Sequence, residues 1–260
     1  MNPDDASTQL LALCAAGMTR MRRPWRLAIS GLPGCGKSTL AQALVARARK
    51  AGWPALALSL DDFYLPRRAR LQLAKTRHPL FATRGVPGTH DLALLQSVLR
   101  QLGQASPDHP VRVPRFDKGR DTRRSPSHWR CVRHAPRLVI LEGWCLGVMP
   151  QPASALIQPI NALERRHDRD TRWRTRVNTL LRDYLSLWDE ADARVLIAST
   201  SWPHVKRLRD RAEDARRRER APHAMDAAQL TQFLAHYERL GRHALATPPA
   251  HADLILPTRR

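Results

Sequence analysis

Residues 31–38 constrain the fold of this chain more than any other segment. They read Gly-Leu-Pro-Gly-Cys-Gly-Lys-Ser and fit the pattern G-x-x-x-x-G-K-[ST] at every fixed position. An apolar run at 25–30 precedes them and an amphipathic run at 37–51 follows. The sequence therefore predicts a strand, a phosphate-binding loop and a helix, which is a unit typical of parallel α/β sheets.

The loop has the residue types that binding a triphosphate requires. Glycines let backbone N–H groups turn toward phosphate oxygens where a Cβ would intrude, and the helix that follows directs its positive end there. We expect Lys37 to lie between the β- and γ-phosphates and Ser38 to bind Mg²⁺, with ATP and Mg²⁺ as cofactors. The predicted nucleotide site consists of Gly31, Leu32, Pro33, Gly34, Cys35, Gly36, Lys37, Ser38 and Thr39.

Short apolar runs alternate with longer amphipathic runs along the chain, as in a parallel sheet flanked by helices. We predict strands at 25–30, 55–60, 111–114, 137–141, 194–198 and, at the sheet edge, 252–256. We predict helices at 5–20, 37–51, 90–103, 160–190, 203–220 and 226–246, and a long loop at 115–136. The expected organisation is one domain over residues 1–260, with 1–24 as an N-terminal helical extension.

Composition argues against several other classes of protein. Lys and Arg number 44 against 23 Asp and Glu, for a formal charge of +21. The basic residues are spread along the chain with few aromatic residues among them, so we do not expect nucleic acid as the main partner. No apolar stretch is long enough to span a membrane, and the four cysteines have no paired spacing. The start is acidic where a signal peptide is basic, so we expect a cytoplasmic protein.

Acidic residues follow two of the predicted strands. Asp61 and Asp62 come after the strand at 55–60, and Glu142 comes after the strand at 137–141. The carboxyl ends of parallel strands meet beside the phosphate loop, where a carboxylate can accept a proton from an attacking hydroxyl or hold Mg²⁺. Two plainer interpretations stay open: an Asp that caps a helix, and a Glu142 that binds no ligand.

With these elements placed, the chain resembles a known group of enzymes. The phosphate loop, Ser59-Leu60-Asp61-Asp62-Phe63-Tyr64 and Leu141-Glu142-Gly143 resemble the P-loop kinases of the uridine kinase, phosphoribulokinase and pantothenate kinase superfamily. Within that superfamily the chain is most similar to the D-glycerate 3-kinase family and its bacterial kinase-like relatives. The closer similarity is carried by TRGVPGTHD at 83–91, PRFDK at 114–118, EGWCLG at 142–147, MD at 225–226 and HYERL at 236–240.

The resemblance implies a fold and a set of roles. The fold is that of P-loop NTPases, a parallel sheet flanked by helices with a helical lid. Asp61 takes the place of the catalytic base, with Asp62 as the alternative, while Lys37 and Glu142 act on the phosphates and Glu142 shares the Mg²⁺ with Ser38. The residues placed at the acceptor are Asp62, Tyr64, Arg84, His90, Asp91, Arg115 and Lys118.

The acceptor residues fit a hydroxy acid. Arginine binds a carboxylate through two parallel hydrogen bonds, which lysine does not, so Arg84 or Arg115 is expected to hold a carboxylate while His90 and Asp91 bind hydroxyls. Two alternatives stay open: 83–91 is a structural turn in which Asp91 caps the next helix, and 115–118 is a surface loop.

A basic helix takes the place of the superfamily's lid, from which an arginine can fold over the transferred phosphoryl group. The sequence does not select among its arginines, and it favours a core position for Trp144 over a pocket wall. The lid arginines are Arg207, Arg209, Arg211, Arg216 and Arg217.

The activity implied by the resemblance is transfer of the γ-phosphoryl group of ATP to a hydroxyl of a small metabolite, with D-glycerate as the expected acceptor. The alternatives are a kinase for a nucleoside, pantothenate or another sugar acid, a non-catalytic regulatory ATP-binding protein, and a slow ATPase. Neither nucleic acid nor a membrane is an expected partner, and the sequence leaves the oligomeric state open.

Overall fold

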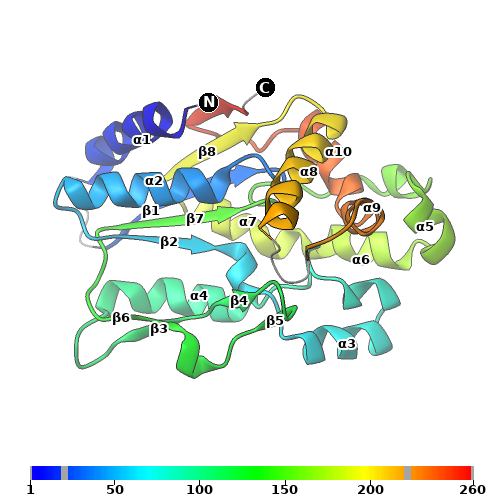
Figure 1. Ribbon diagram of the computed structural model, residues 1–260, viewed down its shortest axis with the longest axis horizontal. Helices are drawn as coiled ribbons and strands as arrows, with labels where there is room; N and C mark the ends of the chain where they lie inside the picture. Colours follow the sequence, from blue (N-terminus) through cyan, green and yellow to red (C-terminus); the bar gives the residue numbers. More distant parts are fainter. Residues whose placement is uncertain (1, 19–22, 220–223, 259–260) are drawn as a thin grey trace.

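A computed structural model describes residues 2–18, 23–219 and 224–258. Its central sheet has five parallel strands in the order β2-β7-β1-β8-β9 (Figure 1). The predicted parallel sheet is confirmed, with its last strand at an edge. The bounds are Trp25–Gly31 for β1, Ala55–Ser59 for β2, Leu138–Gly143 for β7, Ala193–Ala198 for β8 and Leu254–Pro257 for β9.

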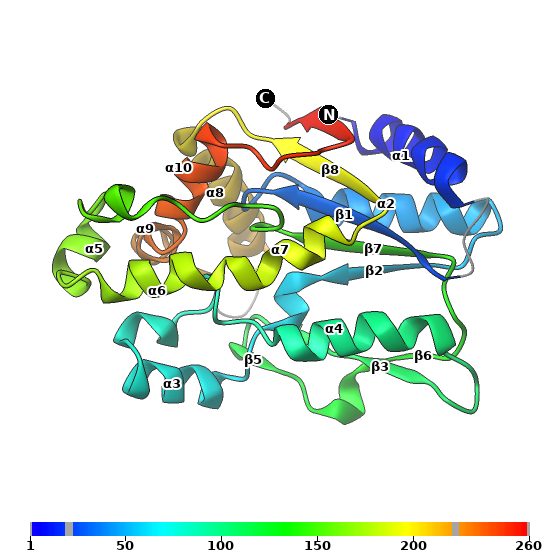
Figure 2. The ribbon, with the colours of Figure 1, turned by 180° about the vertical axis from the view of Figure 1, so that it is seen from behind.

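The alternation of side chains along the strands divides the core between two faces of the sheet. One face packs under α2 (Lys37–Lys50), against which α1 (Pro3–Met18) packs from outside. The other face packs under α4 (Leu92–Gln101) and α7 (Arg182–Asp189). Figures 1 and 2 show the two layers from opposite sides. The predicted helices at 37–51 and 90–103 are confirmed with small changes in their ends. The predicted helix at 5–20 is confirmed as far as residue 18, and residues 19 and 20 lie outside the described part of the chain.

The other helices gather toward the carboxyl end of the sheet (Figure 2). The predicted helical segment 160–190 is divided because the buried Asp168 carboxylate accepts hydrogen bonds from the N–H groups of Trp173 and Arg174, at 2.8 and 3.2 Å, where a new helix begins. The segment 160–190 forms three helices, the last of them α7, and the segment 226–246 forms two. Their bounds are Arg67–Thr76 for α3, Ala162–His167 for α5, Arg172–Leu180 for α6, Trp202–Arg218 for α8, Ala227–Ala235 for α9 and Glu238–Ala246 for α10. None of the helices described is both long and apolar enough to cross a membrane.

The segment 115–136 is not the plain loop that the sequence predicts. It contains β4 (Phe116–Asp117) paired with β5 (Thr122–Arg123), and β6 (Arg130–Val132) paired with β3 (Val111–Val113), both antiparallel. The strand predicted at 111–114 therefore exists, but it lies outside the central sheet. The loop prediction was wrong because strands of two or three residues are too short to show an apolar alternation that a sequence pattern can detect.

Candidate active site

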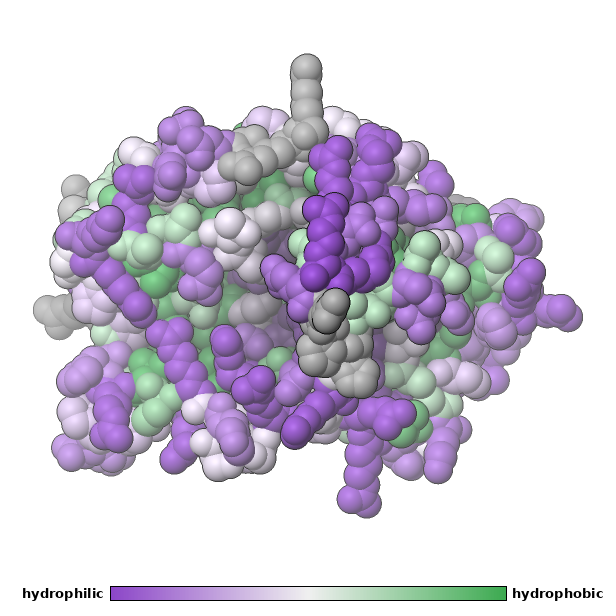
Figure 3. All heavy atoms as spheres, viewed as in Figure 1, coloured by the Kyte–Doolittle hydropathy of each residue, from purple (hydrophilic) through white to green (hydrophobic). Residues whose placement is uncertain are grey.

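A cavity of about 400 Å³ lies at the carboxyl ends of β1, β2 and β7. It joins segments that are far apart in the sequence: the phosphate loop, the turn after β2, the β4–β5 hairpin, and helices α8 and α9. Hydrophilic side chains gather over α8, one wall of this cavity (Figure 3). The lining consists of Pro33, Gly34, Lys37, Ser38, Asp61, Tyr64, Arg84, Lys118, Glu142, Trp144, Arg209, Ala212, Arg216, Phe233 and Tyr237.

The phosphate loop has a conformation that depends on its glycines. Gly34 and Gly36 have φ values of 84° and 94°, which residues with a Cβ rarely adopt, and α2 begins at the next residue, Lys37. The Lys37 side chain is buried, and its ammonium donates a hydrogen bond to the Leu32 carbonyl at 3.2 Å. The predicted strand, loop and helix are therefore all present in the predicted order.

Ser38 and Glu142 form an oxygen-rich corner beside the loop. Glu142 lies at the end of β7, is 4% exposed, and accepts a hydrogen bond from the Ser38 hydroxyl at 2.7 Å. A hydroxyl and a carboxylate are oxygen ligands of the kind that Mg²⁺ prefers, so the residues present fit the expected metal. Burial lowers the pKa of Lys37, but the nearby Cys35, Glu142 and Asp61 outweigh burial and raise it, so the ammonium stays charged.

The two acidic residues after β2 have different surroundings. A short 3₁₀ turn, Leu60–Phe63, follows the strand, and only Asp61 lines the cavity. The Asp61 carboxylate pairs with the Lys118 ammonium at 2.6 Å. Burial raises the pKa of Asp61, but the Lys118 charge outweighs it, so this pKa lies well below its ordinary value. Asp62 accepts a hydrogen bond from the Phe116 N–H at 3.0 Å, and burial raises its pKa.

Arg84 is a fixed cation on another wall of the cavity. Its guanidinium pairs with Asp121 and lies over the rings of Phe116 and Phe233, at 5.6 and 5.7 Å from their centroids. Burial lowers the pKa of Arg84, but the neighbouring Asp121 and Tyr237 outweigh it and raise it. A planar cation held by two aromatic rings and a carboxylate is oriented before a ligand arrives.

His90 and Asp91, both predicted at the acceptor, do not line the cavity. His90 is 6% exposed, its Nδ1 lies 2.8 Å from the Tyr184 hydroxyl, and its ring stacks on Tyr64 at 4.3 Å. Burial lowers its pKa to about 3, so the imidazole is neutral. Asp91 accepts a hydrogen bond from the Leu94 N–H at 3.1 Å and caps α4. The geometry favours the capping alternative for Asp91 and a supporting position, behind Tyr64, for His90.

Arg115 and Thr39 are also outside the lining. The Arg115 side chain is 56% exposed and lies 3.5 Å from the Asp62 carboxylate, which favours the surface alternative for this residue. Lys118, from the same sequence motif, does line the cavity. Thr39 is exposed on α2 and is not among the residues that line the cavity.

The lid helix supplies two of the five arginines predicted there. Arg209 and Arg216 line the cavity, and both pair with the buried Glu213, at 2.7 and 3.2 Å. Trp144 belongs to the core and also lines the cavity, so it combines the two positions that the sequence left open. Phe233 was not predicted, because no motif marks it.

Known proteins match this chain over most of its length, although no protein-family model matches it. A Schizosaccharomyces pombe protein named uncharacterized kinase mug58 is 33% identical over 228 residues, which is 83% of this chain and 79% of that relative. The chain belongs to this family of P-loop kinases. The kinase is also 31% identical over 222 residues to the chloroplastic D-glycerate 3-kinase of Arabidopsis thaliana, covering 82% of its own length but only 46% of the plant protein.

A solved structure is similar to the kinase over nearly the whole chain. The D-glycerate 3-kinase from Cryptococcus neoformans aligns with a TM-score of 0.75 at 25% identity, over 90% of this chain and 86% of that one. The protein named YGR205w aligns with a TM-score of 0.69 at 24% identity and supports the fold alone. The predicted family, the P-loop α/β fold and the ATP-dependent kinase activity are confirmed.

Proposed function

We propose that this kinase transfers the γ-phosphoryl group of ATP to a hydroxyl of D-glycerate. The observation that carries the proposal is one cavity that holds the phosphate-loop Lys37, the ionised Asp61 and the fixed cation Arg84. These groups suit, in turn, the phosphates, the attacking hydroxyl and the carboxylate of a small hydroxy acid. Two of the relatives described above are named D-glycerate 3-kinases, which supports this acceptor.

On the nucleotide side, the chain's own groups bind and neutralise phosphate. The backbone N–H groups of the loop and the start of α2 would bind the phosphates, and the Lys37 ammonium would neutralise the negative charge that grows on the β- and γ-oxygens. Ser38 and Glu142 would hold Mg²⁺, which supplies charge neutralisation on the phosphates when bound. Arg209 and Arg216 on α8 line the same cavity and would add positive charge beside the transferred group.

Asp61 would orient the acceptor hydroxyl and accept its proton. Its pairing with Lys118 keeps the carboxylate ionised, and an ionised carboxylate can align a hydroxyl for in-line attack even where its pKa is low, because positioning dominates phosphoryl transfer. Arg84 would bind the acceptor carboxylate through its planar fork. Tyr64, whose ring lies between His90 and the cavity, would complete the wall of the acceptor site.

The deciding experiment is an acceptor screen in a coupled assay of ADP release. The panel contains D-glycerate, L-glycerate, a nucleoside, pantothenate and other sugar acids, with Lys37→Ala as the inactive control. Stimulation by D-glycerate above the rest supports the proposal. Stimulation by another acceptor replaces the substrate and keeps the kinase, whereas phosphate release that no hydroxyl compound changes would point to an ATPase.

A further inference from the structure

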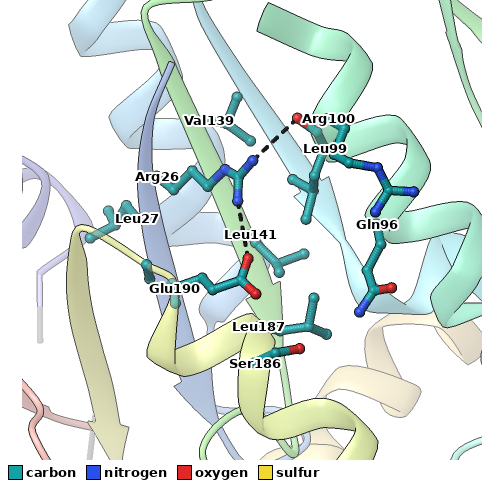
Figure 4. A pocket seen from close by; sticks show the side chains of 12 residues that line it. Arg26, Leu27, Gln96, Leu99, Arg100, Val139, Leu141, Ser186, Leu187 and Glu190 are labelled. Atoms are coloured by element: carbon teal, nitrogen blue, oxygen red, sulfur yellow. Dashed lines mark hydrogen bonds and ion pairs between the residues drawn. The ribbon is translucent and has the colours of Figure 1, made fainter. Parts of the chain in front are cut away.

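A second cavity, of about 340 Å³, lies between α4 and α7 on one face of the sheet (Figure 4). Its lining shares no residue with that of the active-site cavity. The floor is formed by buried side chains of the two central strands, Ala28, Val139 and Leu141, and the walls by Leu99 and Leu187. Ala28 lies beside Leu141 in the β1–β7 register, and it has the shortest side chain of the three floor residues.

Charged groups stand at the rim of this cavity. Arg26 is the one half-buried residue in a strand that is otherwise buried, and its guanidinium extends between the two helices (Figure 4). It lies 3.5 Å from the Glu190 carboxylate on one side and 3.5 Å from the Leu99 carbonyl on the other. Both distances are at the outer limit of a hydrogen bond, and the Glu190 side chain is 68% exposed. The guanidinium is therefore held only weakly by its own protein.

A second arginine makes the rim net positive. Arg100 lines the same cavity from α4, and within the part of the chain that the structure describes no ion pair involves it. Two arginines therefore face one glutamate around an apolar floor. Such a site favours a ligand with an apolar body and one anionic group, because either part alone leaves half of the lining without a complement.

We propose that this cavity binds a small carboxylate with an apolar body of about two rings. The body lies over Ala28 between the helices, and the carboxylate takes a bidentate contact with Arg26 in place of its two long contacts. The volume agrees with this size, since an apolar cavity of about 150 Å³ accommodates one benzene ring. The site is distinct from the acceptor site and does not depend on which acceptor the kinase uses.

The test uses 2-naphthoate as the probe and 2-naphthalenemethanol as its uncharged counterpart. Binding to the full chain is measured by isothermal titration calorimetry, with a non-hydrolysable ATP analogue and Mg²⁺ present at saturation so that the nucleotide site is occupied. We expect one site for 2-naphthoate, and binding of the alcohol that is weaker by roughly tenfold or more, because the charge-assisted hydrogen bonds are lost.

Three variants separate the parts of the site. Arg26→Gln should weaken 2-naphthoate by roughly tenfold and leave the alcohol unchanged. Ala28→Val fills the floor and should weaken both probes. Glu190→Gln frees Arg26 from its competitor and should tighten 2-naphthoate by roughly two- to fivefold. Asp5→Asn, at an exposed position of α1 on the other face of the sheet, makes the same change of net charge as Glu190→Gln and should have no effect.

Thermal unfolding and binding of the ATP analogue verify that each variant is folded. The proposal is overturned if the wild-type chain does not bind 2-naphthoate, or if Arg26→Gln binds both probes as the wild type does. It is also overturned if Ala28→Val leaves binding unchanged, or if Asp5→Asn tightens 2-naphthoate as much as Glu190→Gln, which would indicate attraction by net charge alone.

Discussion

Asp61 and Asp62 are neighbours in sequence, yet the structure predicts different effects of replacing each by Asn. Asp61→Asn should lower turnover, whereas Asp62→Asn should leave turnover close to that of the wild type. Asp61 lines the cavity with Lys37, so Asp61→Asn removes the carboxylate that we propose orients and deprotonates the acceptor. Loss of such a group lowers kcat by about 10²- to 10⁴-fold, or roughly 3–5 kcal/mol in the barrier. ATP should bind at least as tightly, because a negative charge has been removed close to the triphosphate.

Asp62→Asn should act on stability instead. The Asn side-chain oxygen can still accept the hydrogen bond from the Phe116 N–H, but without the charge that strengthens it. Its pair with Arg115, whose side chain is 56% exposed, contributes little. Burial disfavours the Asp62 charge, so its removal offsets part of the weaker hydrogen bond. We expect the unfolding free energy to change by no more than about 1 kcal/mol and the Tm by no more than about 2–4 °C for a chain of this size, with kcat within a few-fold of wild type.

Three assays distinguish the two variants: coupled ADP release with the acceptor, calorimetric titration of the ATP analogue, and urea unfolding. Each variant is the control for the other, since both remove one carboxylate charge at adjacent positions. The reasoning is refuted if Asp62→Asn loses turnover while Asp61→Asn keeps it, because the base would then be the residue that faces the hairpin.

Three further predictions concern other groups of the same cavity. Lys118→Met removes the charge that lowers the Asp61 pKa and leaves burial, which raises it. The acid limb of the kcat/KM pH profile should therefore move to higher pH. An acid limb at the wild-type pH would show that Lys118 does not control the Asp61 pKa. Gly85→Ala places a Cβ 2.0 Å from the Tyr237 hydroxyl at a φ of 135°. It should lower the free energy of unfolding, measured in urea, by about 1–3 kcal/mol. Unchanged stability would show that the Tyr237 side chain moves aside without cost. Arg84→Lys keeps the charge without the planar fork. Steady-state kinetics should therefore give an acceptor KM raised roughly tenfold and an unchanged KM for ATP. An acceptor KM equal to that of the wild type would show that Arg84 does not bind the acceptor.

The sequence predicted those parts of the fold that have strong local signals. The central strands are apolar runs bounded by turns, and the glycine pattern fixes where β1 ends and α2 begins. The boundary between α5 and α6 has no such signal, because it depends on the buried Asp168 carboxylate and on a φ of 63° at Thr171. The hairpin pairs of 115–136 were missed since their strands are too short to show a period.

The site was predictable where its geometry follows from strand order. Asp61 and Glu142 lie at the carboxyl ends of β2 and β7, and Lys37 and Ser38 follow the loop at the carboxyl end of β1. These three strands are neighbours in a parallel sheet, so their carboxyl ends lie side by side. Residues supplied by distant helices have no comparable rule. Phe233 lines the cavity because of the way α9 packs, which no local sequence pattern determines. The motif that contains His90 and Asp91 was recognised, but a motif does not show whether their side chains line the cavity.

Gly34 shows how one residue can serve two requirements. The phosphate-loop pattern leaves its position free, so the motif alone does not explain why a glycine stands there. The backbone has a φ of 84° at this residue, and a Cβ would lie 2.9 Å from the backbone N of Arg209 on α8. The loop can therefore approach the lid this closely only without a side chain. This contact joins the backbone of the loop to the backbone of α8. The positions of Arg209 and Arg216 at the cavity therefore depend on where α8 packs as a whole.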